Sequence, residues 1–187
     1  MKQIHHHYDQ LGNKTRIEEV VIDDGVIVTK NYIHVPVARA DTPTHFGYIY
    51  SKELLSRIYD DMLDRLSGNK PIFGQLCDER YSETKKNGCL LYLTDVSHIV
   101  REVHWDDDTL SVCCEALDGM QYGYLLVEFL NLSCFSFFAS FNGLGTANYK
   151  DNNIVIGNNY RLLNVSLYMD AIPARPMADD DGKVTNG

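Results

Sequence analysis

The 187-residue sequence is poor in basic residues, with 17 lysines and arginines against 26 aspartates and glutamates and a formal net charge of −9. Nucleic-acid binding depends on clustered Lys and Arg side chains that contact phosphates. The charge balance therefore argues against nucleic acid as a main partner. It is compatible with docking on a basic protein surface, although a solvated acidic face gives the same composition.

Long hydrophobic runs are also absent. No apolar stretch approaches the ~20 residues of a membrane-spanning helix, and the N-terminus lacks the apolar region of a signal peptide. We therefore expect no membrane partner. The 44% hydrophobic and 23% charged residues are typical of a globular chain, and the length favours one domain with a sizeable core.

Cysteine is scarce and lacks the spacing of a metal site. The five cysteines are an odd number without a C-x-x-C pair, which predicts reduced thiols in a cytoplasm-like compartment. His5 to His7 lie in a polar N-terminal stretch where consecutive histidines are commonly incidental. Asp106 to Asp108 lack the spacing of a calcium-binding loop. We expect no metal and no cofactor.

Two helices are predicted. The first runs from Ser51, a suitable N-cap, to Leu66, and Gly68 suits its C-terminal stop. Its apolar residues recur at helical spacing, so we expect them in the core: Leu54, Leu55, Ile58, Met62 and Leu66. The second helix runs from Gln121 to Leu132 and is weakened by Gly123.

The other regular segments are predicted to be strands. Two β-rich runs within Ile17 to Thr29 flank the turn residues Asp23 to Gly25. Pro36, in the run from Asn31 to Ala38, indicates an edge strand or a bulge. Further β-rich runs lie at 71–76, 90–105, 109–117, 134–145, 153–156 and 159–173. The pattern predicts a β-rich α+β fold.

The order of these elements, with a strand and charged loop at 71–89 and a serine before a glycine turn at 140–145, resembles the prohead (capsid maturation) serine proteases of tailed bacteriophages, relatives of the herpesvirus assemblins. The resemblance covers roughly Ile33 to Pro176. It implies a closed assemblin-like β-barrel with helices packed outside. We accordingly expect an N-terminal arm at 1–16, the barrel domain at 17–176 and an acidic C-terminal tail at 177–187.

The motifs of that family are only partly kept. Its Gly-Glu-Leu-x-His-Pro strand carries the general base, and the matching residues 74–79 read GQLCDE, with Asp78 in place of the His. Ser140 matches the nucleophile of Ser-Ser-Arg-Gly, but Asn142 replaces the Arg. Ser166 falls at the third position, which supports the base in the family.

These changes predict lost catalysis. A serine hydroxyl needs a base within hydrogen-bond reach, and a carboxylate with a pKa near ~4 is poorly matched to that task. We therefore expect no catalytic residues, with Asp78, Ser140 and Ser166 as degenerate positions. Two alternatives stay open: His98 could act as the base for Ser140, and Cys77 could act as a nucleophile, although its acidic neighbours disfavour the thiolate.

The first functional hypothesis is a virion structural or assembly protein of a tailed bacteriophage, in which a catalytically inactive prohead-protease homologue serves as an auxiliary (decoration or cement) protein of the capsid. Its partners would be the major capsid protein or other head proteins, or a second copy in a homodimer, with assembly in the bacterial host cytoplasm. The alternative is an active, divergent serine endopeptidase of capsid maturation that uses Ser140. A third hypothesis is an unrelated β-barrel binding module. The first two differ in whether an imidazole lies near Ser140.

Overall fold

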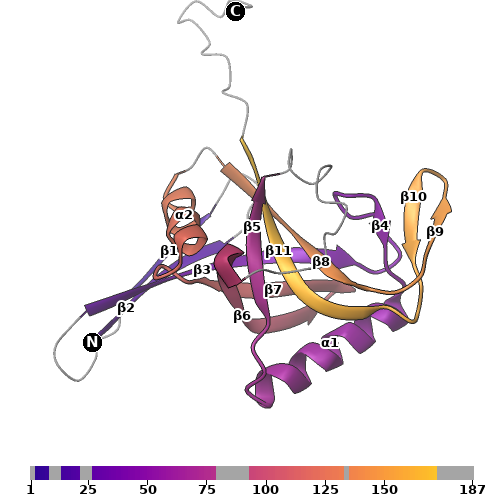
Figure 1. Cartoon of the computed structure of the whole chain (residues 1–187), viewed down its shortest axis with the longest axis horizontal. Helices are drawn as coiled ribbons and strands as arrows, with labels where there is room; N and C mark the ends of the chain where they lie inside the picture. Colours follow the sequence, from indigo (N-terminus) through magenta and orange to yellow (C-terminus); the bar gives the residue numbers. More distant parts are fainter. Residues whose placement is uncertain (1–2, 9–13, 22–26, 79–92, 133–134, 172–187) are drawn as a thin grey trace, which may run out of the picture.

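The computed structural model describes residues 3–8, 14–21, 27–78, 93–132 and 135–171. The chain is β-rich with two α-helices (Figure 1). An eight-stranded sheet has the strand order β1-β2-β3-β7-β6-β5-β11-β8, and a three-stranded sheet has the order β4-β10-β9. The elements are β1 (Gln3–Tyr8), β2 (Lys14–Val21), β3 (Ile27–Arg39), β4 (Tyr48–Ile49), α1 (Lys52–Ser67), β5 (Phe73–Asp78), the 3-10 turn η2 (Leu93–Asp95), β6 (Val96–Asp106), β7 (Thr109–Ala116), α2 (Gln121–Leu130), β8 (Phe135–Leu144), β9 (Ala147–Lys150), β10 (Asn153–Ile156) and β11 (Arg161–Ala171).

Helix α1 confirms the first helix prediction. The Ser51 hydroxyl accepts a hydrogen bond from the Leu54 backbone N–H at 3.2 Å and so caps the N-terminus. At the other end, the Gly68 N–H donates to the Asp64 carbonyl at 3.0 Å. Four residues of the predicted stripe are buried and the fifth, Leu66, is partly buried against the core.

Helix α2 begins at the predicted residue and ends at Leu130 rather than Leu132. The glycine that lowers its helix propensity is needed for packing. A Cβ on Gly123 would lie 1.8 Å from the Leu117 carbonyl oxygen. Close approach of the helix to the residues that follow β7 therefore requires glycine at this position.

The predicted strands are found where the structure describes them, with shifted ends, except that residues 93–95 of the predicted 90–105 strand form the 3-10 turn η2 and β6 begins at Val96. β2 and β3 pair antiparallel, and the predicted Pro36 bulge appears as a register shift between Pro36 and Ala38. Asp107 and Asp108 have φ of 42° and 63° and make the tight turn between β6 and β7. The predicted turn at 23–25, the start of the 90–105 strand and the tail at 177–187 lie outside the described residues. Within the segment expected as an arm, β1 pairs with β2.

The predicted closed barrel is wrong. β1 and β8 are the two ends of the eight-stranded sheet, and no ladder joins them in the described part of the chain. Closure requires a continuous hydrogen-bonded ladder between the first and last strands. Here the β1–β2 hairpin carries one end of the sheet away from the body (Figure 1), while β8 shares the hydrophobic core with β3. The fold is a curved, open sheet.

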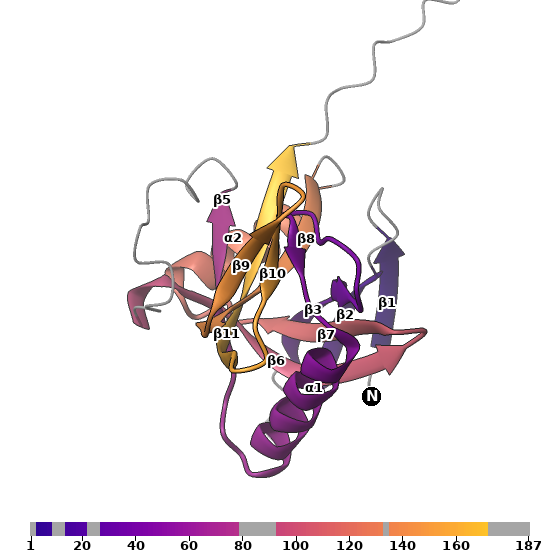
Figure 2. The same cartoon turned by 90° about the vertical axis from the view of Figure 1, so that its right-hand side faces the viewer.

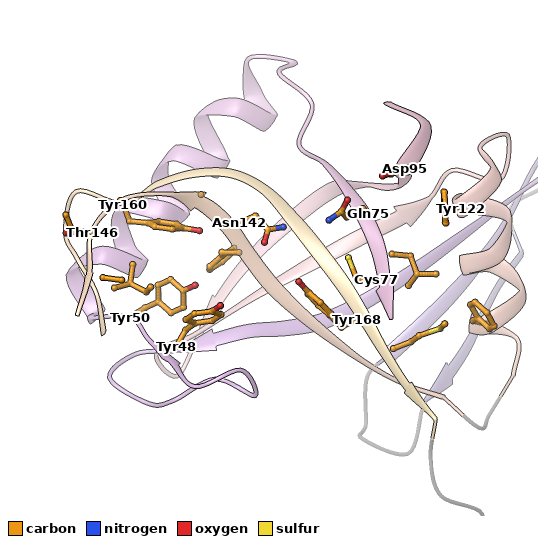
Figure 3. A pocket seen from close by; sticks show the side chains of 18 of the residues that line it. Tyr48, Tyr50, Gln75, Cys77, Asp95, Tyr122, Asn142, Thr146, Tyr160 and Tyr168 are labelled. Carbon is orange, nitrogen blue, oxygen red and sulfur yellow. The ribbon is translucent and has the colours of Figure 1, made fainter. Parts of the chain in front are cut away.

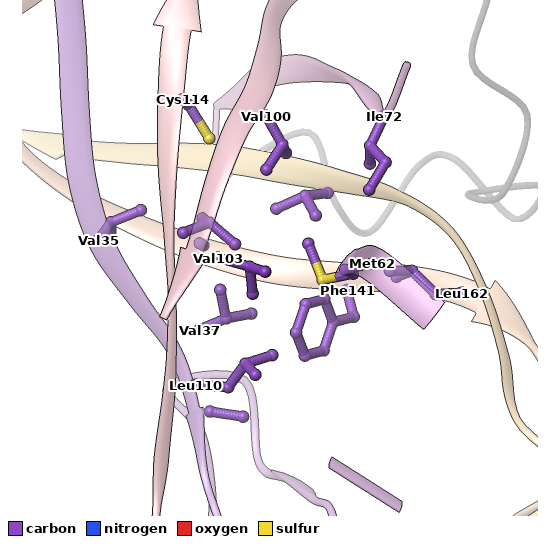
Figure 4. Packing of buried hydrophobic residues seen from close by; sticks show 14 of the residues in the cluster. Val35, Val37, Met62, Ile72, Val100, Val103, Leu110, Cys114, Phe141 and Leu162 are labelled. Atoms are coloured by element: carbon purple, nitrogen blue, oxygen red, sulfur yellow. The ribbon is translucent and has the colours of Figure 1, made fainter. Parts of the chain in front are cut away.

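The hydrophobic core lies inside this curved sheet and is covered at one side by α1. Figure 4 shows Met62 of α1 and Phe141 of β8 among aliphatic side chains of β3, β6 and β7, such as Val35, Val103 and Leu110. All five are buried. The three-stranded sheet stands beside β8 and β11, near the start of α1 (Figures 1 and 2). The end of the molecule with β5, β11 and β8 therefore has the small sheet on one side and α2 on another.

Candidate functional site

The two serines singled out by the sequence lie directly opposite each other. β8 and β11 pair antiparallel, and the register places Ser140 across from Ser166. Directly opposed residues in such a pair project from the same face of the sheet. Ser140 is 7% exposed and Ser166 is 0% exposed. Two candidate positions from distant parts of the sequence are thus brought together.

Asn142 covers the second serine. It lies two residues after Ser140 and therefore on the same face of β8. Its Nδ2 donates to Asn164 Oδ1 at 2.7 Å and to Ser166 Oγ at 2.6 Å. A carboxamide nitrogen carries two hydrogens, so both are used within this cluster. The residue that replaces the family Arg is held in place by β11.

β5, which lies on the other side of β11 from β8, places Gln75 in line with Ser140 and Ser166 across the sheet. β5 runs parallel to β11, with Leu76 paired to Leu167 and Cys77 paired to Tyr168. The residues just before the first pair, Gln75 and Ser166, are therefore neighbours. The Cys77 thiol and the Tyr168 hydroxyl are hydrogen bonded, which places both on one face. By strand alternation, Gln75 and Ser166 share that face.

Asp78 lies further along β5 than Gln75, away from the two serines. Its backbone pairs with Met169, three residues beyond Ser166 on β11. Three residues correspond to about 10 Å along a strand, and β11 separates β5 from β8. The structure therefore places the Asp78 backbone away from the Ser140–Ser166 pair; its side chain lies outside what the structure describes.

His98 is fully buried and both ring nitrogens have partners. Nδ1 lies 2.8 Å from the Ser97 hydroxyl, and Nε2 lies 3.2 Å from the Val165 carbonyl oxygen. Because a carbonyl only accepts, Nε2 carries the proton and Nδ1 accepts from Ser97. Burial lowers the pKa of His98 to about 4, although the Val165 contact opposes this shift. The imidazole is neutral near pH 7 and engaged at both ends.

Gly74 makes room for this histidine. A Cβ on residue 74 would lie 2.2 Å from His98 Nε2 and 1.9 Å from the Val165 carbonyl oxygen. Gly74 pairs with His98 across β5 and β6, where a bulge follows. The imidazole therefore occupies space beside β5 that any other residue at position 74 would fill.

The remaining histidines can be placed relative to Ser140. His5 to His7 belong to β1, at the opposite end of the sheet from β8. His34 of β3 and His104 of β6 lie together, with ring centroids 6.1 Å apart, on strands that are not neighbours of β8 in the sheet. The sequence contains no other histidine apart from His45 and His98.

His45 is the imidazole that comes close to the strand of Ser140. Its ring stacks on Phe138, with centroids 3.9 Å apart and an interplanar angle of 15°. Phe138 lies two residues before Ser140 on the same face of β8, a separation of about 7 Å along the strand. Sequence reasoning missed His45, because it belongs to a turn whose position follows only from tertiary packing.

Phe46 and Tyr168 extend the aromatic contact between His45 and Phe138. Phe46 lies against Tyr168, with ring centroids 4.6 Å apart, and Tyr168 is directly opposite Phe138 in the β8–β11 register. His45 and Phe46 meet edge to face at 5.0 Å. The turn that precedes β4 is thus packed on the same face of β8 and β11 as the two serines.

A cavity of about 780 Å³ lies beside the serine pair (Figure 3). Gln75, Cys77 and Asn142 line it, whereas Ser140 and Ser166 are not among its described lining residues. Five tyrosines form much of the rest of the wall: Tyr48, Tyr50, Tyr122, Tyr160 and Tyr168. Towards α2 the wall becomes largely apolar and includes Leu76, Leu125, Phe129 and Met169. The volume is within the usual range of ligand pockets.

Two of these tyrosines have hydroxyls with a raised pKa. Burial, and next the neighbouring Tyr48, raises the pKa of the Tyr50 hydroxyl well above its ordinary value, although a hydrogen bond with Tyr160 opposes the shift. Burial is also the largest cause that raises the pKa of Tyr168, followed by Cys77 and Tyr48. Both hydroxyls are neutral at physiological pH, as tyrosines ordinarily are, and can both donate and accept hydrogen bonds.

Within the described residues, no group of three or more His, Cys, Asp or Glu side chains is arranged to hold a metal ion. Neither of the two α-helices described is long and apolar enough to cross a membrane.

No protein-family model matches the sequence, and no curated protein matches it. Among solved structures, the chain is similar to the capsid assembly protease gp21 of bacteriophage T4, with a TM-score of 0.63 and 12% sequence identity. The match covers 90% of this chain and 96% of that chain. At this identity the similarity shows a shared, prohead-protease-like fold.

Proposed function

We propose that this chain is a catalytically inactive prohead-protease homologue that acts in the head of a tailed bacteriophage. Its fold is shared with a capsid assembly protease over nearly the whole length of both chains. The observation that carries the inactive assignment is the row of side chains around Ser140. Across β11 and β5 this row contains Ser166 and Gln75, neither of which is a base at neutral pH.

The positions of the histidines support the same conclusion. Serine attack requires proton removal by a base within about 3 Å of the hydroxyl oxygen. His98 donates to Val165 and accepts from Ser97, and its low pKa makes it a weak base. Asn142 is neutral and its nitrogen is directed to Asn164 and Ser166, so it supplies no positive charge to a developing oxyanion.

We infer that the protein acts by binding. A cavity lies beside the degenerate site, and its walls are suited to contact another protein. The partner in this proposal is the major capsid protein or another head protein, and the role is that of an auxiliary decoration or cement protein in the virion, assembled in the host cytoplasm. The net charge of −9 is compatible with docking on a basic surface. A second copy of the chain is a further candidate partner.

One observation favours a second candidate function. His45 is exposed and stacks on Phe138, two residues from Ser140 on the same strand. A rearrangement of the turn at 41–47 that brought the imidazole to the hydroxyl would assemble a serine–histidine pair. The alternative function is therefore a divergent serine endopeptidase of capsid maturation with Ser140 as nucleophile and His45 as base.

The proposed function is tested by the composition of the virion. Quantitative mass spectrometry of purified virions of the encoding phage should find the full-length chain at a fixed, stoichiometric ratio to the major capsid protein. Purified protein should also co-sediment with assembled heads. Absence of the chain from virions, together with no co-sedimentation, would refute the proposal.

A further inference from the structure

The described wall of the cavity is almost free of charge. Of its 19 described lining residues, Asp95 is the one charged side chain, and none is a lysine or arginine. Tyrosine hydroxyls are protonated near pH 7 at their ordinary pKa, and burial raises the pKa of Tyr50 and Tyr168 further. A ligand that enters the cavity therefore meets neutral hydroxyls, carboxamides and apolar side chains.

This chemistry disfavours an anionic ligand. Transfer of a carboxylate or phosphate from water to a buried site is costly unless a cation or several donors compensate. The described lining offers no cation, and Asp95 would add repulsion. Acidic peptides and nucleic acid are therefore poor occupants, whereas an uncharged segment carries no such cost.

The centre of the cavity presents groups that match a peptide main chain. Gln75 and Asn142 line it from β5 and β8, on either side of β11 (Figure 3). Asn142 donates through its nitrogen to Asn164 and Ser166, so it offers a ligand its Oδ1 as an acceptor. A carboxamide oxygen is a suitable acceptor for a backbone N–H, and a tyrosine hydroxyl can either donate or accept a hydrogen bond.

The end of the cavity at α2 is largely apolar, although Tyr122 of the same helix also lines it. Leu125 and Phe129 project from successive turns of the helix, and Leu76 and Met169 come from β5 and β11. Phe129 is supported by Phe135, with ring centroids 4.9 Å apart. Such a surface would stabilise a large aliphatic or aromatic side chain by removing it from water.

We propose that the cavity binds an uncharged, extended segment of a head protein, with main-chain amides against Gln75 and Asn142 and one large apolar side chain against Leu125 and Phe129. This inference rests on the proposed function, which supplies a head protein as the partner. It adds the place of contact and the chemistry of the segment that is recognised.

Selection from an mRNA-displayed library of random dodecapeptides, with the purified full-length chain as bait, tests this proposal. The enriched peptides should be uncharged in the bound stretch and share one large apolar residue. The informative variant is Leu125→Lys, which places a cation at the apolar end. Leu125 is 36% exposed, so the substitution is compatible with folding. The matched control is Tyr124→Lys, because Tyr124 is 56% exposed on the same helix and is not among the described lining residues.

The enriched peptides should bind Leu125→Lys at least about tenfold more weakly than wild type, while Tyr124→Lys should bind them as wild type does. A fresh selection on Leu125→Lys should enrich acidic residues. Enrichment of acidic peptides on the wild type, equal binding to both lysine variants, or no enrichment at all would overturn the proposal.

Co-sedimentation with assembled heads separates this failure from failure of the proposed function. If wild type and Leu125→Lys bind heads equally, the head contact lies elsewhere and only the present inference is lost. If wild-type protein does not bind heads, the proposed function itself fails.

Discussion

Nε2 of His98 lies 3.2 Å from the carbonyl oxygen of Val165, the residue immediately before Ser166. The imidazole of His98 on β6 therefore reaches across β5, at Gly74, to the backbone of β11, the strand that carries Ser166. The Val165 carbonyl lies beside Gly74 and receives a hydrogen bond from the imidazole, as buried carbonyls generally require. His98 therefore has a structural role in the sheet.

A pH dependence of stability follows from this contact. The pKa of His98 is about 4 in the folded protein, against an ordinary value of 6.5. Between these values the unfolded chain binds the proton and the folded chain does not. The stability is therefore complete above about pH 6.5 and declines as the pH falls towards 4, by on the order of 3 kcal/mol for this group. Denaturant unfolding at several pH values measures the slope.

Two controls isolate His98 in that experiment. His98→Gln should flatten the slope between pH 6.5 and pH 4, whereas His104→Gln, which alters an exposed histidine on β6, should keep it. NMR titration of the wild-type imidazoles gives the pKa directly and needs no variant. A His98 resonance that titrates near pH 6.5 would contradict the account.

Gly74→Ala should destabilise the protein, because its Cβ would overlap both the Val165 carbonyl and the His98 ring. Backbone cannot move away as a flexible side chain would, so we expect a loss of about 1–3 kcal/mol or more. Gly119→Ala is the matched control, since a Cβ there meets nothing within 4 Å. Thermal melts should show a lower midpoint for Gly74→Ala alone. Equal midpoints would show that the space beside β5 is not needed.

Leu55→Ala should cost about 2–5 kcal/mol, because Leu55 is fully buried on the inner face of α1. Leu63→Ala on the same helix removes a side chain that is 40% exposed, and its cost should be clearly smaller. Chemical denaturation of both variants compares the two faces. Similar losses for the two substitutions would mean that the buried face has been misassigned.

Local patterns predicted most of the elements. The apolar stripe of α1, its Ser51 cap and the Pro36 bulge each follow from the spacing or chemistry of a few adjacent residues. The order of strand, loop and serine motif was enough to indicate the prohead-protease-like fold. Barrel closure could not be predicted in this way, because it depends on whether β1 and β8 share a ladder, and no local pattern encodes that pairing.

The composition of the site depended on register. Alignment of the motif drew attention to Asp78, but the parallel pairing of β5 with β11 brings Gln75 next to Ser166. A shift along a strand changes both the distance to a partner and the face that is presented. His45 was missed for a related reason, since its stack on Phe138 joins residues about ninety positions apart.

The central claim is that Ser140 is an ordinary hydroxyl, and its reaction with a fluorophosphonate probe tests this most directly. Such probes label serines that a neighbouring base activates. Wild-type protein, Ser140→Ala and His45→Ala would be incubated with the probe and examined by intact mass spectrometry. The account predicts no covalent adduct on any of the three. A stoichiometric adduct on the wild type that is lost in both variants would contradict it, and would make the chain a serine hydrolase with His45 as its base.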